Sequence, residues 1–198
     1  MAPPPEGAWA VLAGAQLARR YGLPYRASGG LTNAKVVDAQ AAYESQWTLW
    51  PAVMGHSNLI MHAVGWLDGG LTASFEKFII DAENLAMFAH FLADFAVTDA
   101  TLALDAIREV GPGGHHFGTA HTEARFRTEH YQSALADRQA YATWQESGGL
   151  DAEQRAHTLY RQLLAEYVPP PLDDAIRAEL ADYVARRTRD LAGVRLYD

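Results

Sequence analysis

Three glycine-rich loops carry the side chains of this sequence that are best suited to chemistry. They span residues 28–33, 65–71 and 111–118. Working residues in α/β folds lie in the loops that follow the carboxyl ends of parallel strands, so these loops are the predicted functional region. Glycine permits positive φ and a close approach of the backbone to a ligand. Ordinary turns use glycine in the same way, and both interpretations stay open from the residues alone.

The loop at 65–71 is the most informative of the three. His62 precedes it at the end of an apolar run, Trp66 and Asp68 lie within it, and Glu76 follows at the start of a predicted helix. An aromatic face attracts a cation, and nearby carboxylates balance its charge, so this segment predicts a pocket for a tertiary or quaternary ammonium group. Two plainer interpretations remain: His62 as a satisfied core histidine, and Glu76 as an ordinary acid at a helix N-terminus.

Other aromatic and histidine clusters give weaker signals. Trp47 and Trp50 are interpreted as core and helix-seam residues. His115, His116 and His121 form an H-H-x4-H pattern that matches no ligand motif with a known mechanism, so no metal site is predicted. A metal-dependent lyase or hydrolase that uses these three histidines remains an alternative. The sequence also contains no nucleophile elbow and no phosphate-binding loop.

Composition excludes several classes of function. The 198 residues include 16 Lys and Arg against 24 Asp and Glu, which gives a formal net charge of −8. This acidic balance gives no electrostatic footprint for nucleic acid or an anionic membrane, so neither is an expected partner. The absence of cysteine excludes disulfides, thiol nucleophiles and iron–sulfur ligation. The start of the chain does not resemble a signal peptide, and the apolar stretch at 84–97 is too short to cross a bilayer, so a cytoplasmic protein is expected.

The elements that must position the loops follow from periodicity and end signals. The pattern predicts an extended segment at 24–28 and a strand at 58–64 that is covered on both faces. Helices are predicted at 8–21, 34–50, from Ser74 onward, 99–110, 122–144, 151–168 and 173–192. Within these, the second helix is expected to end before Pro51, and Asp151 with Gln154 resembles a capping box. The helix after Ser74 carries an apolar stripe that is interpreted as core: Phe75, Phe78, Ile79, Ala82, Leu85, Ala86 and Ala89.

This order of elements predicts a helix-rich α/β fold in one domain, residues 1–198. Strand and helix units occupy 1–118, and C-terminal helices occupy 119–198. Two or three parallel strands make a poor sheet by themselves, because both faces and both edges need cover. We therefore expect the chain to be part of a larger fold.

Several segments together resemble the trimethylamine methyltransferase family. They are residues 16–24, 29–40, 62–71 (HAVGWLDGGL), 74–78, 111–115 and 121–122, in the family's order along nearly the whole chain. The segment at 62–71 looks like the branch that lacks pyrrolysine and is similar to glycine betaine methyltransferases. No single segment is specific, but the combination is.

The resemblance implies the C-terminal part of a TIM (β/α)8 barrel, because a complete barrel needs about 250 residues. It also implies transfer of a methyl group from a methylated amine, such as glycine betaine or trimethylamine, to the Co(I) of a corrinoid. A partner protein would carry that corrinoid, and this chain would bind no cofactor itself. The full-length form is expected to be a homo-oligomer. A non-catalytic remnant is the alternative for a chain of this length.

The resemblance and the loop positions suggest roles for particular residues, although no catalytic residue is assigned. Trp66 would pack on the ammonium group, His62 would donate to a polar group of the substrate, and Glu76 would balance charge or fix the loop. The substrate-binding set also includes Asn33. The loops expected to face the corrinoid contain Gly29, Gly30, Gly69, Gly70 and His115.

Overall fold

The computed structural model describes residues 5–195, which form a helix-rich α/β structure. These residues divide into two compact units, one ending at Gln162 and one beginning at Leu163. The first unit contains every strand of the described chain and all three glycine-rich loops. The second contains the end of α8 and the helix α9.

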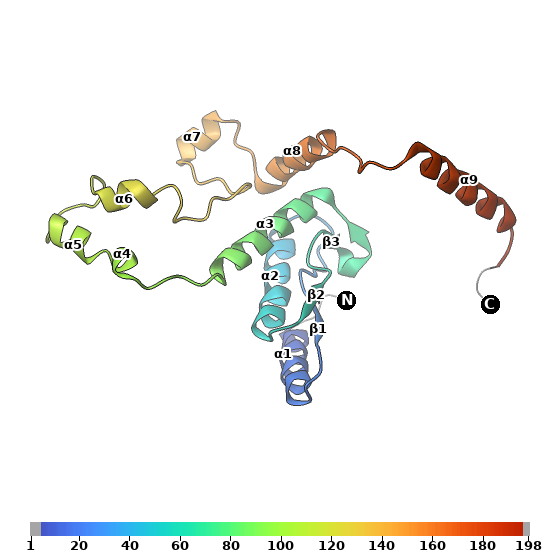
Figure 1. The fold of residues 1–198 in the computed structure, drawn as a ribbon, viewed down its shortest axis with the longest axis horizontal. Coiled ribbons are helices and arrows are strands. Elements are labelled where there is room, and N and C mark those ends of the chain that lie inside the picture. Colours follow the sequence, from blue (N-terminus) through green and yellow to red (C-terminus); the bar gives the residue numbers. More distant parts are fainter. Residues whose placement is uncertain (1–4, 196–198) are drawn as a thin grey trace. The chain divides into compact units, whose positions relative to one another are not determined.

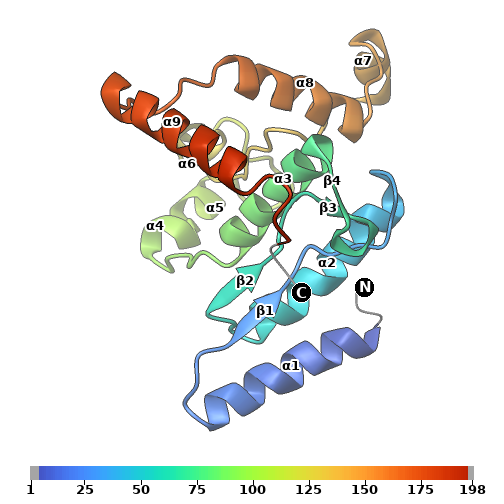
Figure 2. The same cartoon turned by 90° about the vertical axis from the view of Figure 1, so that its right-hand side faces the viewer.

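A parallel strand pair with a connecting helix forms the base of the first unit (Figures 1 and 2). Strand β1 (Arg26–Ser28) pairs with β2 (Leu59–Met61), with Ala27 opposite Ile60. Helix α2 (Ala39–Met54) connects them, and α1 (Pro5–Arg20) packs against α2. Both predicted strand segments are confirmed, although each is shorter than expected. Because the pair is parallel, the chain leaves β1 and β2 at the same edge of the sheet.

A short hairpin follows β2 and leads into the next helix. Strands β3 (Trp66–Leu67) and β4 (Thr72–Ala73) pair antiparallel around the 3-10 turn η1 (Asp68–Gly70). The turn needs left-handed backbone, with φ of 64° at Gly69 and 90° at Gly70, which glycine adopts at little cost. Helix α3 (Phe75–Phe91) then begins at the Ser74 N-cap, whose hydroxyl accepts from the Lys77 N–H, as predicted.

The small apolar core lies where α2 and β3 meet the loop before α2. Ala34, Ala41 and Leu67 are buried against one another, with Val37 packed beside them. Trp50 of α2 packs on two rings of α3, Phe88 and Phe91, at centroid distances of 4.5 Å and 5.7 Å. The predicted helix-seam role of Trp50 is therefore confirmed. Trp47 is exposed, so the core interpretation of that residue is wrong.

Helix α2 does not end before Pro51, as the sequence predicts, but continues to Met54. A proline inside a helix lacks the N–H that would bond the carbonyl one turn earlier. Pro51 and its neighbour Ala52 are buried, and burial of apolar surface offsets the lost hydrogen bond. The prediction failed because it used only the local rule for proline.

Two of the predicted helices, at 99–110 and 122–144, are replaced by pairs of shorter helices. The expected helix at 99–110 is split at Ala103, whose φ is 53°, into α4 (Asp99–Leu102) and α5 (Leu104–Val110). The expected helix at 122–144 is wrong: only α6 (Ala120–Arg125) and α7 (Tyr141–Glu146) form. The segment between α6 and α7 is hydrogen-bonded to Glu83 of α3. The Glu83 carboxylate accepts from the Tyr131 hydroxyl at 3.1 Å and from the Ala134 N–H at 3.2 Å. This tertiary contact holds the segment in a non-helical path.

The last two helices follow the sequence closely. Helix α8 (Ala152–Ala165) begins with the predicted capping box, in which Asp151 and Gln154 exchange hydrogen bonds of 2.9 Å and 2.8 Å. Helix α9 (Asp174–Asp190) begins at the Asp173 N-cap. Both predictions are confirmed because a capping interaction lies within four residues of sequence.

The parallel pair is less covered than the sequence predicts. Leu59 is 55% exposed and Met61 is 39% exposed, so the expectation of a strand covered on both faces is wrong. No third strand joins β1 and β2 within the described residues, and these residues close no barrel.

Helix α3 buries a polar face instead of the predicted apolar stripe. Its buried residues are Lys77, Asp81, Asn84 and Phe88, which share one face at helical spacing. Phe75 and Phe78, predicted as core, are 61% and 50% exposed. The correction matters for function, because the exposed rings of α3 line the pocket described next.

Candidate functional site

An apolar pocket of about 380 Å³ lies between the β3–β4 hairpin and the start of α3. Its lining residues are Val64, Gly65, Trp66, Ala73, Ser74, Phe75 and Phe78. Three of these are aromatic, and none carries a charge. Its volume falls in the range typical of small-molecule sites, about 300–1,000 Å³.

Gly65 lies in the pocket wall and contacts the first residues of α3 and its N-cap. Its backbone has a φ of 82°, and a Cβ at this position would lie 3.3 Å from the Phe78 side chain. The Gly65 carbonyl accepts from the Ser74 N–H at 3.0 Å. Trp66 pairs with Ala73 in the hairpin. A glycine is therefore required immediately before Trp66 if the indole is to stand beside the two phenylalanine rings.

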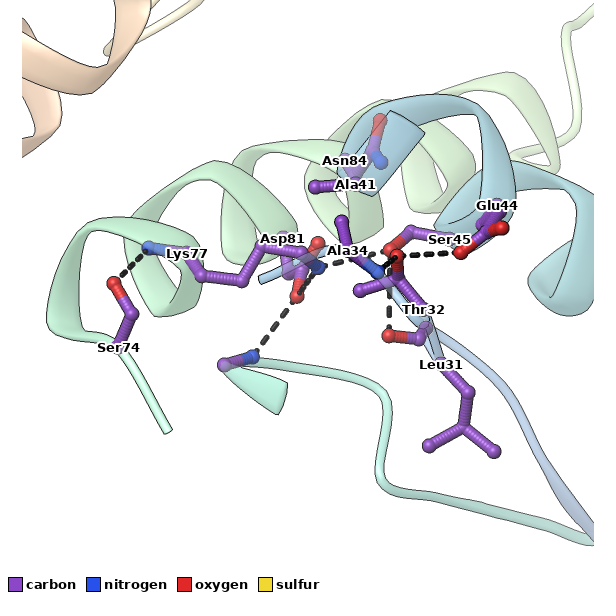
Figure 3. A network of polar contacts seen from close by, with 12 residues as sticks. Leu31, Thr32, Ala34, Ala41, Glu44, Ser45, Ser74, Lys77, Asp81 and Asn84 are labelled. Atoms are coloured by element: carbon purple, nitrogen blue, oxygen red, sulfur yellow. Dashed lines mark hydrogen bonds and ion pairs between the residues drawn. The ribbon is translucent and has the colours of Figure 1, made fainter. Parts of the chain in front are cut away.

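A buried ion pair lies on the face of α3 that contacts α2 (Figure 3). Lys77 and Asp81 of α3 contact each other, and each side chain is 1% exposed. Asp81 Oδ2 also accepts from the Gly65 N–H at 2.9 Å. Lys77 Nζ also donates to Ser45 Oγ of α2 at 2.8 Å. Burial raises the pKa of Asp81 and lowers the pKa of Lys77, and their mutual contact offsets part of each shift.

A second carboxylate organises the loop after β1. Glu44 Oε2 of α2 accepts from Thr32 Oγ1 at 2.6 Å and from the Asn33 N–H at 2.7 Å, and Oε1 accepts from Gln40 at 3.0 Å. Burial alone would raise the pKa of Glu44, but these three hydrogen bonds outweigh it and lower the pKa. The loop at 28–33 is also tied to the hairpin, because the Thr32 carbonyl accepts from the Gly69 N–H at 2.8 Å.

The structure brings His62 close to Trp66. Their ring centroids are 6.2 Å apart in an edge-to-face arrangement, and His62 Nδ1 lies 3.2 Å from Ser28 Oγ. Ser28 ends β1 and His62 follows β2, so these side chains meet at the shared carboxyl edge of the pair, as the sequence analysis expects. His62 is exposed, and its φ of 61° is unusual for a residue with a side chain.

Glu76 lies beside the pocket and contacts helix α8. Its Oε2 accepts from Ser74 Oγ at 2.8 Å, and its Oε1 lies 2.9 Å from His157 Nδ1. The hydrogen bond with His157, followed by one from its own backbone N–H, lowers the pKa of Glu76. Phe75 stacks on Tyr160 of α8 at 5.1 Å. Ser74 thus connects the pocket wall to the Glu76 carboxylate, while α8 packs on one aromatic wall.

The remaining predicted residues are dispersed. Gly29 and Gly30 are buried: a Cβ would lie 2.7 Å from Leu49 at Gly29 and 2.3 Å from the Ala63 carbonyl at Gly30. By contrast, the space beside Gly70 is open. Asn33 is placed by its backbone contact with Glu44, and His115 lies in an exposed loop with its ring 5.4 Å from Phe117.

Other candidate sites fit the expected chemistry less well. Over residues 5–195, no group of three or more histidine, aspartate or glutamate side chains could hold a metal ion. His121 instead lies 3.0 Å from the Ala100 carbonyl oxygen. A cavity of about 270 Å³ near α6 is lined by the ion pair of Arg125 and Glu129 and by a single aromatic ring that is not histidine, Phe126, so it offers a methylated cation fewer aromatic faces. The described helices include none that is long and apolar enough to cross a membrane.

Sequence reasoning missed Phe75, Phe78 and the Lys77–Asp81 pair. The two rings belong to an apolar stripe, and such a stripe normally faces the core. The i, i+4 spacing of Lys77 and Asp81 was a visible signal, but this spacing is more often found in exposed ion pairs. Only the packing of α3 against α2 shows that these charges are buried.

The sequence of this chain is similar to those of known methyltransferases. A family model described as trimethylamine methyltransferase (MTTB) matches residues 1–192. A glycine betaine methyltransferase of Desulfitobacterium hafniense (strain Y51) is 43% identical over 187 residues, which are 94% of this chain and 39% of that protein.

Two trimethylamine methyltransferases are also similar. MttB of Desulfitobacterium hafniense (strain DSM 10664 / DCB-2) is 36% identical over 91% of this chain and 36% of its own length. MttB1 of Methanosarcina acetivorans is 31% identical over the same shares. The chain therefore spans less than two fifths of the length of these relatives, between 36% and 39%.

Proposed function

This chain belongs to the trimethylamine methyltransferase family, and from that membership we propose that its aromatic pocket binds the methylated ammonium group of a methyl donor. The donor would be a quaternary or tertiary amine, such as glycine betaine or trimethylamine. The observation that carries the proposal is the set of three rings, Trp66, Phe75 and Phe78, around an apolar pocket with no charged lining residue. A methylated ammonium group has no N–H to donate or only one, so aromatic faces suit it better than hydrogen-bond acceptors.

The fold supports a place for this pocket in a larger α/β barrel. The parallel strands β1 and β2 are each followed by a helix, α2 and α3, and the β3–β4 hairpin is inserted between β2 and α3. In such barrels the loops after the strands build the active site. The predicted residues His62 and Trp66 both follow β2, and the predicted residue Asn33 lies in the loop after β1. Within the described residues the outer side of each strand of the pair is unpaired, and further strands can pair there. We therefore propose that this chain forms part of a TIM barrel.

The chemistry that suits this pocket is methyl transfer to a corrinoid carried by a partner protein, as the family resemblance implies. A Co(I) corrinoid supplies a strong nucleophile for a methyl carbon. The bond from nitrogen to that carbon breaks, and its electron pair stays on nitrogen, so a quaternary donor needs no prior protonation. The pocket residues then have to bind, orient and desolvate the donor.

The surroundings of the pocket fit these tasks. The three rings would cover part of the ammonium group, and His62, which follows β2, would donate to a carboxylate such as that of glycine betaine. The hairpin turn with Gly70 leaves open space for the approach of a second protein. Glu76 has two hydrogen-bond partners, and we assign it to holding α3 and α8 beside the pocket.

Calorimetric titration of the 198-residue chain with glycine betaine tests the proposal. We expect saturable binding, and Trp66→Ala should weaken it about fivefold, because a cation–π contact in a pocket whose other rings are half exposed contributes about 1 kcal/mol. Trp9→Ala is the matched control, since Trp9 is an exposed residue of α1. Its affinity should equal that of the wild type.

A second ligand separates recognition of charge from recognition of shape. The anion of tert-butylacetic acid has the shape of glycine betaine but a neutral carbon in place of the cationic nitrogen. Equal affinity for the two ligands, or unchanged binding by Trp66→Ala, would contradict the proposed pocket. Methyl transfer from glycine betaine to cob(I)alamin then distinguishes an active chain from a non-catalytic remnant.

A further inference from the structure

The Lys77–Asp81 pair lies outside the pocket wall but fixes the backbone from which the wall is built. Asp81 Oδ2 accepts from the N–H of Gly65, and the next residue along the chain is Trp66. The Gly65 carbonyl is held on its other side by the Ser74 N–H. The peptide units on both sides of Gly65 therefore have defined orientations, and these set the direction of the Trp66 side chain.

The same pair reaches the other glycine loop. Lys77 Nζ donates to Ser45 Oγ at 2.8 Å, and Ser45 Oγ donates to the Gly30 carbonyl at 3.3 Å. Figure 3 shows Lys77, Asp81 and Ser45 lying together between α3 and α2. A continuous set of contacts thus connects Gly65 to Gly30, which lie in the segments that follow the two parallel strands.

Stability alone does not require charges at these two positions. Buried ion pairs are often replaced by apolar residues of similar volume without loss of stability. An apolar pair, however, provides no acceptor for the Gly65 N–H. A buried backbone N–H without a partner is costly, so the loop would move to reach another acceptor or water.

We propose that Asp81 and Lys77 are positioning residues for Trp66. Asp81 holds the Gly65 amide, Lys77 orients Asp81 and connects it to Ser45, and together they keep the indole in the pocket wall. This inference rests on the proposed function only for its consequence, which is affinity for a methylated ammonium group. The positioning itself is a property of the free chain.

Two double variants with equal net charge test the proposal. K77M/D81N removes both charges but keeps an acceptor oxygen for the Gly65 N–H, whereas K77M/D81L removes the acceptor as well. The first measurement is the affinity for glycine betaine. The second is acrylamide quenching of Trp66, taken as the difference between each protein and its Trp66→Phe counterpart.

We expect K77M/D81N to bind within about twofold of the wild type, and K77M/D81L to bind about fivefold more weakly, as Trp66→Ala does, since its unpaired N–H displaces the loop that carries Trp66. Trp66 should be more accessible to acrylamide only in K77M/D81L. Equal affinity and equal quenching in the two folded variants would overturn the proposal. If the wild type binds no glycine betaine, the proposed function fails, and the quenching comparison still decides the positioning role.

A measurement on the wild-type chain covers the case in which K77M/D81L does not fold. Hydrogen exchange of the Gly65 amide should be as slow as that of the α3 amides, because its acceptor Asp81 is buried. Exchange as fast as in an exposed turn would show that Asp81 does not hold this amide, and would overturn the proposal equally.

Discussion

Removal of one partner from the Lys77–Asp81 pair should destabilise the first unit severely. The two side chains are each 1% exposed, so Lys77→Met leaves Asp81 without a cation and without water. Loss of one member of a buried pair costs about 3–5 kcal/mol. That is a large part of the 5–15 kcal/mol by which a domain of this kind is usually stable.

The double variant distinguishes a coupled pair from two independent contributions. If the single changes K77M and D81L were additive, the double would lose about 6–10 kcal/mol. Because the pair is buried as a unit, we expect K77M/D81L to lose only about 1–3 kcal/mol, the cost of the unpaired Gly65 N–H. Urea unfolding of the four proteins, followed by circular dichroism, measures the coupling. Additive losses would refute the assignment of a tightly coupled pair.

Two controls accompany this cycle. Arg186→Met removes one partner of an exposed i, i+4 pair on α9, Asp182 with Arg186, and should leave the free energy of unfolding essentially unchanged. In Lys77→Met, burial still raises the pKa of Asp81 above its unfolded value. The folded state of this variant then binds a proton at Asp81 more tightly than the unfolded state does, so the destabilisation should shrink as the pH falls toward about 4, the ordinary pKa of an aspartate.

Two further predictions concern the residues around the pocket. Gly65→Ala should destabilise the chain by about 1–2 kcal/mol in urea unfolding, because a side chain is placed at a φ of 82° with Phe78 at 3.3 Å; unchanged stability would contradict the geometry of the loop. Glu76 has a lowered pKa in the folded chain, so its contribution is fully present above its unfolded pKa and is lost as the pH falls through the folded pKa. The stability difference between wild type and Glu76→Gln should therefore diminish between about pH 6 and pH 3, and a difference that grows with acidity would reverse the sign argued here.

The local parts of this fold were predictable from the sequence. The Ser74 N-cap and the Asp151–Gln154 capping box depend on groups within four residues of each other, and both form as predicted. The loops after the two strands meet at one edge because parallel pairing requires it, and His62 and Trp66 lie together there. Their roles in binding remain predictions.

Two of the incorrect predictions failed because of packing or contacts between residues far apart in the sequence. The segment around Tyr131 and Ala134 was predicted to be helical, but hydrogen bonds to Glu83 hold it in another conformation. These bonds join residues that are 48 and 51 positions apart in the sequence. Burial of Pro51 keeps α2 helical past a residue that usually ends a helix. Periodicity records only which side chains share a face, and these contacts decide which face is buried.

Helix α3 shows most clearly which features depend on the local sequence and which depend on tertiary packing. The sequence by itself determined that residues from Ser74 onward form a helix and that Phe75 and Phe78 share one face, because 3.6 residues complete each turn. Tertiary structure alone decided that this face borders an open pocket and that Lys77 and Asp81 lie in the interior. The physical reason is that a buried pair of charges needs partners on other elements. Ser45 of α2 and the Gly65 amide, supplied by the fold, meet that need.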